Sequence, residues 1–237
     1  MTDSPPRLTR EQVRRVDRLA VDRLGLPSIV LMENAALNAA AFVLDLLQQD
    51  EDRLGPDPRA AVLCGGGNNG GDGYALARHL RNFGLPVTCF AVTDPAQLAG
   101  DAKVNHDATA ALGVEVVPVL NDQDLDAAAP HWQLAAVVVD ALLGTGFHGE
   151  VRPHAAAVIH ALNQLDHPRV LALDCPSGLD CETGRPSNAA VRAAATLTFV
   201  AEKAGFAQPD ARPCLGRVVT ADIGVPLDWA LRVAAEA

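Results

Sequence analysis

Seven short apolar runs recur between residues 60 and 222, and they constrain the possible fold more than any other feature of this sequence. The runs are rich in Val, Leu and Ala, and they cover residues 60–64, 86–92, 114–119, 134–140, 169–174, 195–200 and 217–222. Strands that are apolar on both faces belong to parallel sheets covered by helices on both sides, and the segments between the runs are long enough for crossover helices. We therefore predict an α/β protein, a three-layer doubly wound Rossmann-like sandwich with a mostly parallel sheet.

Two helices are predicted ahead of the first run. Residues 8–26 place Thr9 at an N-cap position with Gln12 three residues later, which is a capping-box pattern, and Gly25 ends the apolar periodicity. Residues 27–47 are apolar on most sides, which is typical of a buried helix. These two N-terminal helices complete the predicted architecture.

Composition narrows the class of function. The chain has 237 residues, of which 49% are hydrophobic, so a large core can form and we predict one domain over residues 1–237. The net charge of −10 argues against a surface for nucleic acid or for an anionic membrane. No secretory signal and no run approaching transmembrane length is apparent, and the five cysteines form no CxxC pair. We therefore expect a cytoplasmic protein with reduced thiols and with no nucleic-acid or membrane partner.

The segment GGGNNGGDG at residues 65–73 follows the first apolar run and precedes a helical pattern. Its first, third and sixth residues are glycines, and together with Asp94 after the next run they approximate the dinucleotide fingerprint. A nicotinamide-dependent oxidoreductase is therefore one interpretation. That fingerprint does not explain the additional side chains Asn68, Asn69 and Asp72. Bare backbone amides suit a phosphate, and amide and carboxylate oxygens suit a polar group or a cation.

Polar residues also follow two later runs. In doubly wound sheets, ligands bind beyond the carboxyl ends of the strands, where the strand order reverses. Asp140 ends one run, and Asp174 ends another, followed by Ser177 on a bend that contains proline and glycine. Taken alone, Asp140 is also explained as a cap of the turn that follows it. Two carboxylates and the glycine-rich segment, all at strand ends, predict a convergent site.

Other catalytic patterns are absent from the sequence. The seven histidines form neither HExxH nor a Cys/His spacing suited to zinc, and there is no GxSxG elbow or GxxxxGK[ST] loop. Cys175 lies in an apolar run with no neighbouring base in the sequence. It is therefore interpreted as a buried, inert thiol rather than a nucleophile.

Several motifs, in order, resemble those of the NAD(P)H-hydrate epimerases, the YjeF N-terminal domain family. They read GLPSIVLMENAA in the front helices, GGGNNGGDGYALARHL at residues 65–80, DALLGTG at 140–146 and DCPSGLD at 174–180. The tail motif AEKAGF departs from the family's more usual A-P-K-x-G, and Ala36 stands where the family usually has glycine. The resemblance covers residues 8 to about 223.

The resemblance implies that the chain interconverts the R and S forms of hydrated NADH and NADPH, in which the nicotinamide ring carries a hydroxyl at position 6. It implies a potassium ion as cofactor, with Asn69, Asp140 and Ser177 as its ligands. The substrate-contacting residues carried over are Asn68, Asn69, Gly70, Gly71, Asp72, Gly144, Thr145, Gly146, Phe147, His148, Gly149, Glu150 and Asp174.

Inversion at the hydroxylated carbon needs an acid/base group close to the hydroxyl. We expect Asp174 to be that group, and Lys203 to be a weaker candidate that orients substrate or balances charge. Of the 19 basic residues only Lys103 and Lys203 are lysines, which draws attention to Lys203, although a surface lysine is the alternative.

Expected partners are the hydrated dinucleotide as small-molecule substrate and a second copy of the chain, because a homodimer is a family expectation. Many bacterial members are fused to a C-terminal dehydratase domain, and this chain ends at Ala237. We therefore expect no such domain here and a separate dehydratase that acts on the product. A non-catalytic protein that binds a nucleotide or a partner is the remaining alternative.

Overall fold

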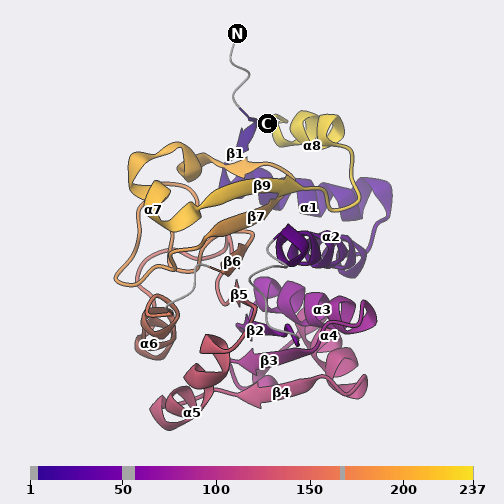
Figure 1. Cartoon of the computed structure of the whole chain (residues 1–237). Helices are drawn as coiled ribbons and strands as arrows, with labels where there is room; N and C mark the ends of the chain where they lie inside the picture. The colour runs from indigo at the N-terminus through magenta and orange to yellow at the C-terminus, as the bar shows by residue number, and fades with distance from the viewer. Residues whose placement is uncertain (1–4, 50–56, 166–168, 237) are drawn as a thin grey trace.

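All seven predicted strands are present in the computed structural model, which describes residues 5–49, 57–165 and 169–236 (Figure 1). The strands are β2 (Ala60–Cys64), β3 (Val87–Ala91), β4 (Glu115–Pro118), β5 (Val137–Ala141), β6 (Val170–Leu173), β7 (Ala195–Phe199) and β9 (Arg217–Ala221). Each hydrogen-bonded pair in this sheet runs parallel. The predicted parallel sheet is confirmed.

The strand order, β4-β3-β2-β5-β6-β7-β9, reverses between β2 and β5. The chain joins this sheet at β2, moves outward through β3 to β4 at one edge, and returns to β5 on the other side of β2 (Figure 1). A crevice forms at such a reversal because the connections on its two sides leave in opposite directions. The loops after β2 and β5 are therefore the place where a ligand site is expected.

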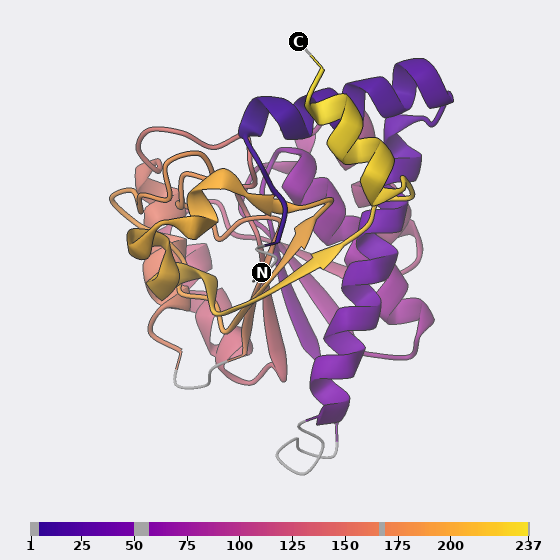
Figure 2. The ribbon, with the colours of Figure 1, turned by 90° about the horizontal axis from the view of Figure 1, so that it is seen from above.

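Helices cover both faces of the sheet (Figures 1 and 2). The helices on one face are α2 (Ser28–Gln49), α3 (Asn68–Asn82) and α4 (Gly100–Ala111), and those on the other are α5 (Asp122–Gln133) and α6 (Pro153–Leu162). Because successive strand residues point to opposite faces, they enter separate cores. Val62 packs in the core under α2 and α3, and its neighbour Leu63 packs in the core under α5 and α6. The predicted three-layer sandwich is thereby confirmed.

The helix predicted from the capping box is α1 (Arg10–Leu24). The side chain of Thr9 accepts a hydrogen bond from the Gln12 backbone at 3.2 Å, and the Gln12 side chain accepts one from the Thr9 backbone at 2.9 Å. Gly25 ends the helix in the left-handed conformation, with φ of 67°. Both predicted ends of this helix are confirmed.

Helix α2 corrects one expectation. It is 22 residues long and, by length and composition only, apolar enough to span a membrane, so the expectation that no run approaches transmembrane length was wrong. The physical reason is that its alanines count as apolar while their small size suits close packing in a protein core. The buried face of α2 lies against α3 and against strands β7 and β9, as a core helix does.

Several short elements were not predicted. Strand β1 (Arg7–Leu8) pairs in parallel with β8 (Glu202–Lys203), which brings the start of α1 beside the last motif of the sequence. The others are η2 (Pro95–Gln97), η3 (Ala204–Ala207), η4 (Pro209–Ala211), α7 (Arg212–Leu215) and α8 (Leu227–Ala234). Helix α8 packs on α1 (Figure 2). Two-residue strands show no periodicity, so sequence patterns cannot reveal them.

Candidate active site

A cavity of about 670 Å³ lies where the strand order reverses. The segments that follow β2, β5, β6 and β7 form one side of it, and residues of α1 and α2 form the other. Of the residues predicted to contact substrate, the cavity brings together Asn68, Asn69, Asp72, Gly144, Thr145, Gly146, Phe147 and Asp174. The remaining predicted residues do not line it: Gly70 and Gly71 are buried in the first turn of α3, and His148, Gly149 and Glu150 are exposed beyond it.

The glycines of the loop after β2 allow the backbone of α3 to approach the strand ends closely. A Cβ on Gly70 would lie 1.9 Å from the carbonyl oxygen of Gly65, and a Cβ on Gly65 would lie 2.0 Å from that of Leu142. Gly67, by contrast, has no atom within 4 Å of its Cβ position, and it caps α3 without a side-chain hydrogen bond. The first turn of α3 therefore presents backbone amides toward the cavity, which suits an anionic ligand group.

Asp140 and Ser177 form a buried polar pair behind the cavity. The Ser177 hydroxyl donates to Asp140 Oδ1 at 2.5 Å, and the Ser177 backbone donates to Oδ2 at 2.8 Å. Burial raises the pKa of Asp140 to about 6, although these hydrogen bonds and one from the Leu142 backbone oppose the shift. Asp140 does cap its turn through Leu142, at 3.2 Å, but most of its hydrogen bonding goes to Ser177.

Asn69, in the first turn of α3, is the third residue predicted to hold the cation. Its side chain is buried and lies against Gly144, where an added Cβ would be 3.2 Å from Asn69 Cγ. Neither Oδ1 nor Nδ2 of Asn69 has a hydrogen-bond partner within the described parts of the chain. A buried amide without a partner is costly unless a ligand or ion satisfies it. An amide, a carboxylate and a hydroxyl oxygen suit a hard or weakly hydrated cation and not zinc, so these residues fit potassium.

Asp174 occupies a strained turn at the end of β6. Its φ is 60°, and the Cys175 amide donates to the Leu173 carbonyl at 2.7 Å, which closes a three-residue γ-turn around it. The neighbouring strand β7 ends in the same way, with Val200 at φ 69° inside a γ-turn from Phe199 to Ala201. A non-glycine residue at such a φ costs about 1–3 kcal/mol and is often found at functional sites.

Lys203 lies between these two turns and is fully buried, which excludes the surface-lysine alternative. Its Nζ is 2.8 Å from Asp174 Oδ1, as an ion pair without good hydrogen-bond alignment. The same ammonium donates hydrogen bonds to the carbonyls of Phe199 at 2.8 Å and Ala201 at 3.2 Å, on either side of Val200. Lys203 does not line the cavity, so it contacts Asp174 from the protein interior.

Two further carboxylates face the same region. Burial raises the pKa of Asp72 well above its ordinary value, and the carboxylates of Asp174 and Asp17 raise it further. Loss of hydration in the cavity wall is the largest cause that raises the pKa of Asp17, to about 6. The Asp174 carboxylate raises this pKa further, and the Lys203 ammonium lowers it. Asp17 is exposed, so solvent in the cavity weakens these effects. Sequence reasoning missed Asp17, because one acidic residue on an amphipathic helix gives no signal.

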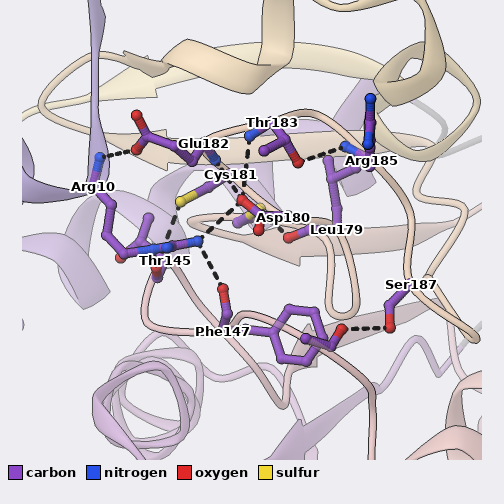
Figure 3. Close-up of polar contacts among 12 residues, drawn as sticks. Arg10, Thr145, Phe147, Leu179, Asp180, Cys181, Glu182, Thr183, Arg185 and Ser187 are labelled. Carbon is purple, nitrogen blue, oxygen red and sulfur yellow. Dashed lines mark hydrogen bonds and ion pairs between the residues drawn. The ribbon is translucent and has the colours of Figure 1, made fainter.

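The turn after β5 is tied to the rest of the site by Arg10 (Figure 3). The Arg10 guanidinium donates to the carbonyls of Thr145 at 2.7 Å and Phe147 at 2.9 Å, and it pairs with Asp180 at 3.0 Å. The Thr145 amide in turn points to Asp174 Oδ2 at 3.4 Å. Arg10, which the sequence analysis did not single out, therefore joins α1 to two of the motifs.

The five cysteines are buried, and Cys181 lies close to the site, with its Sγ 3.4 Å from the Thr145 carbonyl oxygen. Cys175 is fully buried, and burial raises the pKa of its thiol well above the ordinary value, as expected for an inert cysteine. No group of three or more His, Cys, Asp or Glu side chains within the described residues is arranged to hold a metal ion.

Comparison with known proteins finds several relatives of this chain. The chain is 39% identical over 217 residues to an NAD(P)H-hydrate epimerase of Pirellula staleyi, with 92% of each chain covered. It is 37% identical over 225 residues to one of Rhodopirellula baltica, with 94% of this chain and 86% of the relative covered. It is also 37% identical to a bifunctional NAD(P)H-hydrate repair enzyme of Moorella thermoacetica, of whose length it spans 40%.

A solved structure, that of yeast Ynu0, has the same fold, with a TM-score of 0.78 over 98% of this chain and 94% of that chain at 21% identity. The sequence pattern of the family described as YjeF-related protein N-terminus matches residues 28–205, which include the glycine loop and both strand-end aspartates. This chain therefore belongs to the YjeF-related protein N-terminus family.

Proposed function

We propose that this protein is an isomerase that interconverts the R and S epimers of hydrated NADH and NADPH, as part of nicotinamide cofactor repair. The observation that carries the proposal is the ion pair of Asp174 with the buried Lys203, which sets one carboxylate at a fixed position in a cavity built from dinucleotide-type loops. The names of the relatives from Pirellula staleyi and Rhodopirellula baltica support the substrate and the reaction.

The reaction inverts a carbon that bears a hydroxyl and is bonded to a ring nitrogen. One route protonates the hydroxyl, loses water to a cation stabilised by that nitrogen, and adds water again from the other face. A second route opens the ring to an aldehyde and recloses it. Either route needs a proton to be moved at the hydroxyl oxygen, and Asp174 is the residue that we assign to this role. Lys203 holds the Asp174 carboxylate in place and offsets its charge.

The rest of the cavity would hold the nucleotide. In this assignment the loop from Asn68 to Asp72 and the turn from Gly144 to Phe147 contact the phosphate and ribose groups. His148, Gly149 and Glu150 are assigned to substrate by the family resemblance only. They would have to reach the ligand from outside the cavity.

A potassium ion is proposed as cofactor, held by Asn69, Asp140 and Ser177. The partnerless buried amide of Asn69 and the oxygen donors of the other two residues support this assignment. When bound, the ion would supply positive charge beside the loops that hold the nucleotide. Asn69 follows β2, Asp140 lies near the end of β5 and Ser177 follows β6, so their role is to keep these three neighbouring strand ends in register with one another.

The cellular setting follows from the chemistry. Epimerisation only converts one hydrate into the other, and restoring the intact cofactor requires the removal of water. We therefore propose that a separate dehydratase acts on the product of this protein. The five cysteines are free and buried, which supports a reducing compartment such as the cytoplasm. A homodimer and a single domain over residues 1–237 stay predictions.

The deciding experiment is incubation of the protein with separately purified R and S hydrates of NADH, with the epimer ratio followed by chromatography. We expect either epimer to relax to the same mixture much faster than without protein. An unchanged ratio, together with oxidation of intact NADH when an electron acceptor is added, would instead support the nicotinamide-dependent oxidoreductase.

A further inference from the structure

One whole face of α1 lines the cavity. Val13, Arg14, Asp17, Arg18 and Val21 all contribute to it, and their spacing of three and four residues places them on the same side of the helix. No residue of α1 has been assigned to a ligand by the motifs, although this helix forms much of the wall opposite the strand ends. The side chains of this wall are therefore candidates for further contacts with a ligand.

Two arginines of this wall have no protein partner, unlike the other arginines of α1. Arg10 binds two carbonyls and Asp180, Arg15 donates to the carbonyl of Ala234, and Arg23 pairs with Glu236. Arg14 and Arg18 are exposed, and within the described residues neither makes an ion pair or a hydrogen bond to the protein. Their guanidinium groups are thus free to bind a ligand in the cavity.

The remaining charges of the cavity are negative. Its lining includes Asp17, Asp72, Asp101 and Asp174, and among the described lining residues Arg14 and Arg18 are the cationic side chains. Asp72 and Asp174 interact electrostatically and lie on the wall opposite α1, whereas Asp17 lies on α1 between Arg14 and Arg18. The net charge of the whole chain is −10, so the electrostatic field of the protein as a whole does not attract an anion either.

A dinucleotide carries at least two phosphate charges, which have to avoid the carboxylates. Guanidinium groups bind phosphate oxygens through paired, charge-assisted hydrogen bonds, and two of them one helical turn apart can hold adjacent phosphates. We propose that Arg14 and Arg18 form a phosphate subsite on the α1 wall, opposite the glycine loop, that fixes the orientation of the dinucleotide with its phosphates between these two walls and its nicotinamide ring at Asp174. This inference rests on the proposed function, because it takes the ligand to be a dinucleotide.

The test is calorimetric titration with ADP-ribose, which has the pyrophosphate but no nicotinamide ring, and with NADPH, which adds a 2′-phosphate. Arg14→Gln and Arg18→Gln should each weaken binding by roughly tenfold, as expected for loss of a hydrogen bond to a charged group. The matched control is Arg23→Gln, at the far end of the same helix, which should bind like wild type. In epimerisation assays the two variants should raise KM while kcat stays close to wild type, because the ring and Asp174 are untouched.

The two ligands identify which phosphate is bound. An equal loss for ADP-ribose and NADPH assigns the subsite to the pyrophosphate, and a loss for NADPH alone assigns it to the 2′-phosphate. Unchanged affinity for both ligands in the double variant, or no binding of either ligand to wild type, overturns the inference. Binding of ADP-ribose that depends on the arginines, in a protein that leaves both hydrates unchanged, would uphold the subsite and overturn the epimerase proposal.

Discussion

Lys203 Nζ lies 2.8 Å from Asp174 Oδ1, and the same ammonium binds the carbonyls on both sides of Val200. Asp174 and Val200 are the two non-glycine residues with positive φ in the described chain, and each is the middle residue of a γ-turn at the end of a neighbouring strand. One buried charge thus holds two strained turns. Because strain of this kind persists only where surrounding contacts enforce it, Lys203 is the residue that maintains the position of Asp174.

Replacement of Asp174 by Asn should keep the size of the side chain and abolish proton transfer. General acid/base groups contribute ~10²–10⁴-fold, so epimerisation by Asp174→Asn should fall by that amount with a modest change in KM. Asp94→Asn is a matched control, because Asp94 also follows a strand but caps η2 outside the cavity. Activity of Asp174→Asn within a few-fold of wild type would exclude Asp174 as the acid/base.

Replacement of Lys203 by Met should destabilise the fold. Removal of one partner of a buried ion pair leaves the other charge uncompensated, at a cost of about 3–5 kcal/mol in the free energy of unfolding. The double variant Asp174→Asn/Lys203→Met should recover part of that loss, since no charge is then left unpaired. Urea denaturation measures both effects, and a double variant less stable than Lys203→Met alone would show that the pair does not act as a unit.

Potassium should raise the thermal stability of the protein relative to choline at equal ionic strength, because an ion that binds only the folded state stabilises it by mass action. For a chain of this size each 1 kcal/mol shifts Tm by roughly 2–4 °C. Asn69→Ala should remove the effect, whereas Asn68→Ala, at an exposed neighbouring position, should retain it. Equal melting temperatures of wild type in the two salts would contradict the cation site.

The glycine loop should tolerate a methyl group at one position and not at another. Gly70→Ala would bring its Cβ within 1.9 Å of the Gly65 carbonyl oxygen, and overpacking of this kind costs about 1–3 kcal/mol or more. Gly67→Ala meets no atom within 4 Å and should leave stability nearly unchanged. Thermal unfolding of the two variants side by side checks this contrast, and similar losses in both would refute the packing argument.

The pKa of Asp17 should depend on the charge of Asp174. In wild type a carbon-13 NMR titration should give Asp17 a pKa above its ordinary value, up to about 6, and Asp174→Asn should lower it, because the Asp174 carboxylate is a cause of the shift. A pKa above the ordinary 3.8 means that the folded protein binds this proton more tightly than the unfolded chain does. The resulting stability is fully present below about pH 4 and is lost as the pH rises through about 6. The Asp17→Asn variant should lack this loss. The free energy of unfolding of the variant, relative to that of wild type, should therefore increase between about pH 4 and pH 7.

The strands and the glycine loop could be predicted because each follows from a local pattern. A run apolar on both faces indicates a strand buried under two layers, and Thr9 with Gln12 and Gly25 marks both ends of a helix. The burial of Lys203 could not be predicted this way. It depends on the pairing of β8 with β1 and on the ion pair with Asp174, and both of these partners lie far from Lys203 in the sequence.

The α1 wall of the cavity was missed for the same reason. The sequence shows an amphipathic helix with many arginines, and all of its exposed positions look alike. Only the fold separates Arg10, which binds the turn after β5, from Arg14 and Arg18, which face the cavity without a partner among the described residues. Positions of this kind become visible only when tertiary contacts are known.

The pairing of β1 with β8 also sets an order of events during synthesis. Arg7 and Glu202 are 195 residues apart in the chain yet form one ion pair, and α1 rests on α8 near the other end. A ribosome therefore releases the first helix of the described chain long before its partners exist. The sheet can assemble strand by strand as it emerges, but the contacts of β1 and α1 with β8 and α8 can form only after residues 202–234 have been made. The cavity therefore acquires its fully anchored α1 wall late in the synthesis of this domain.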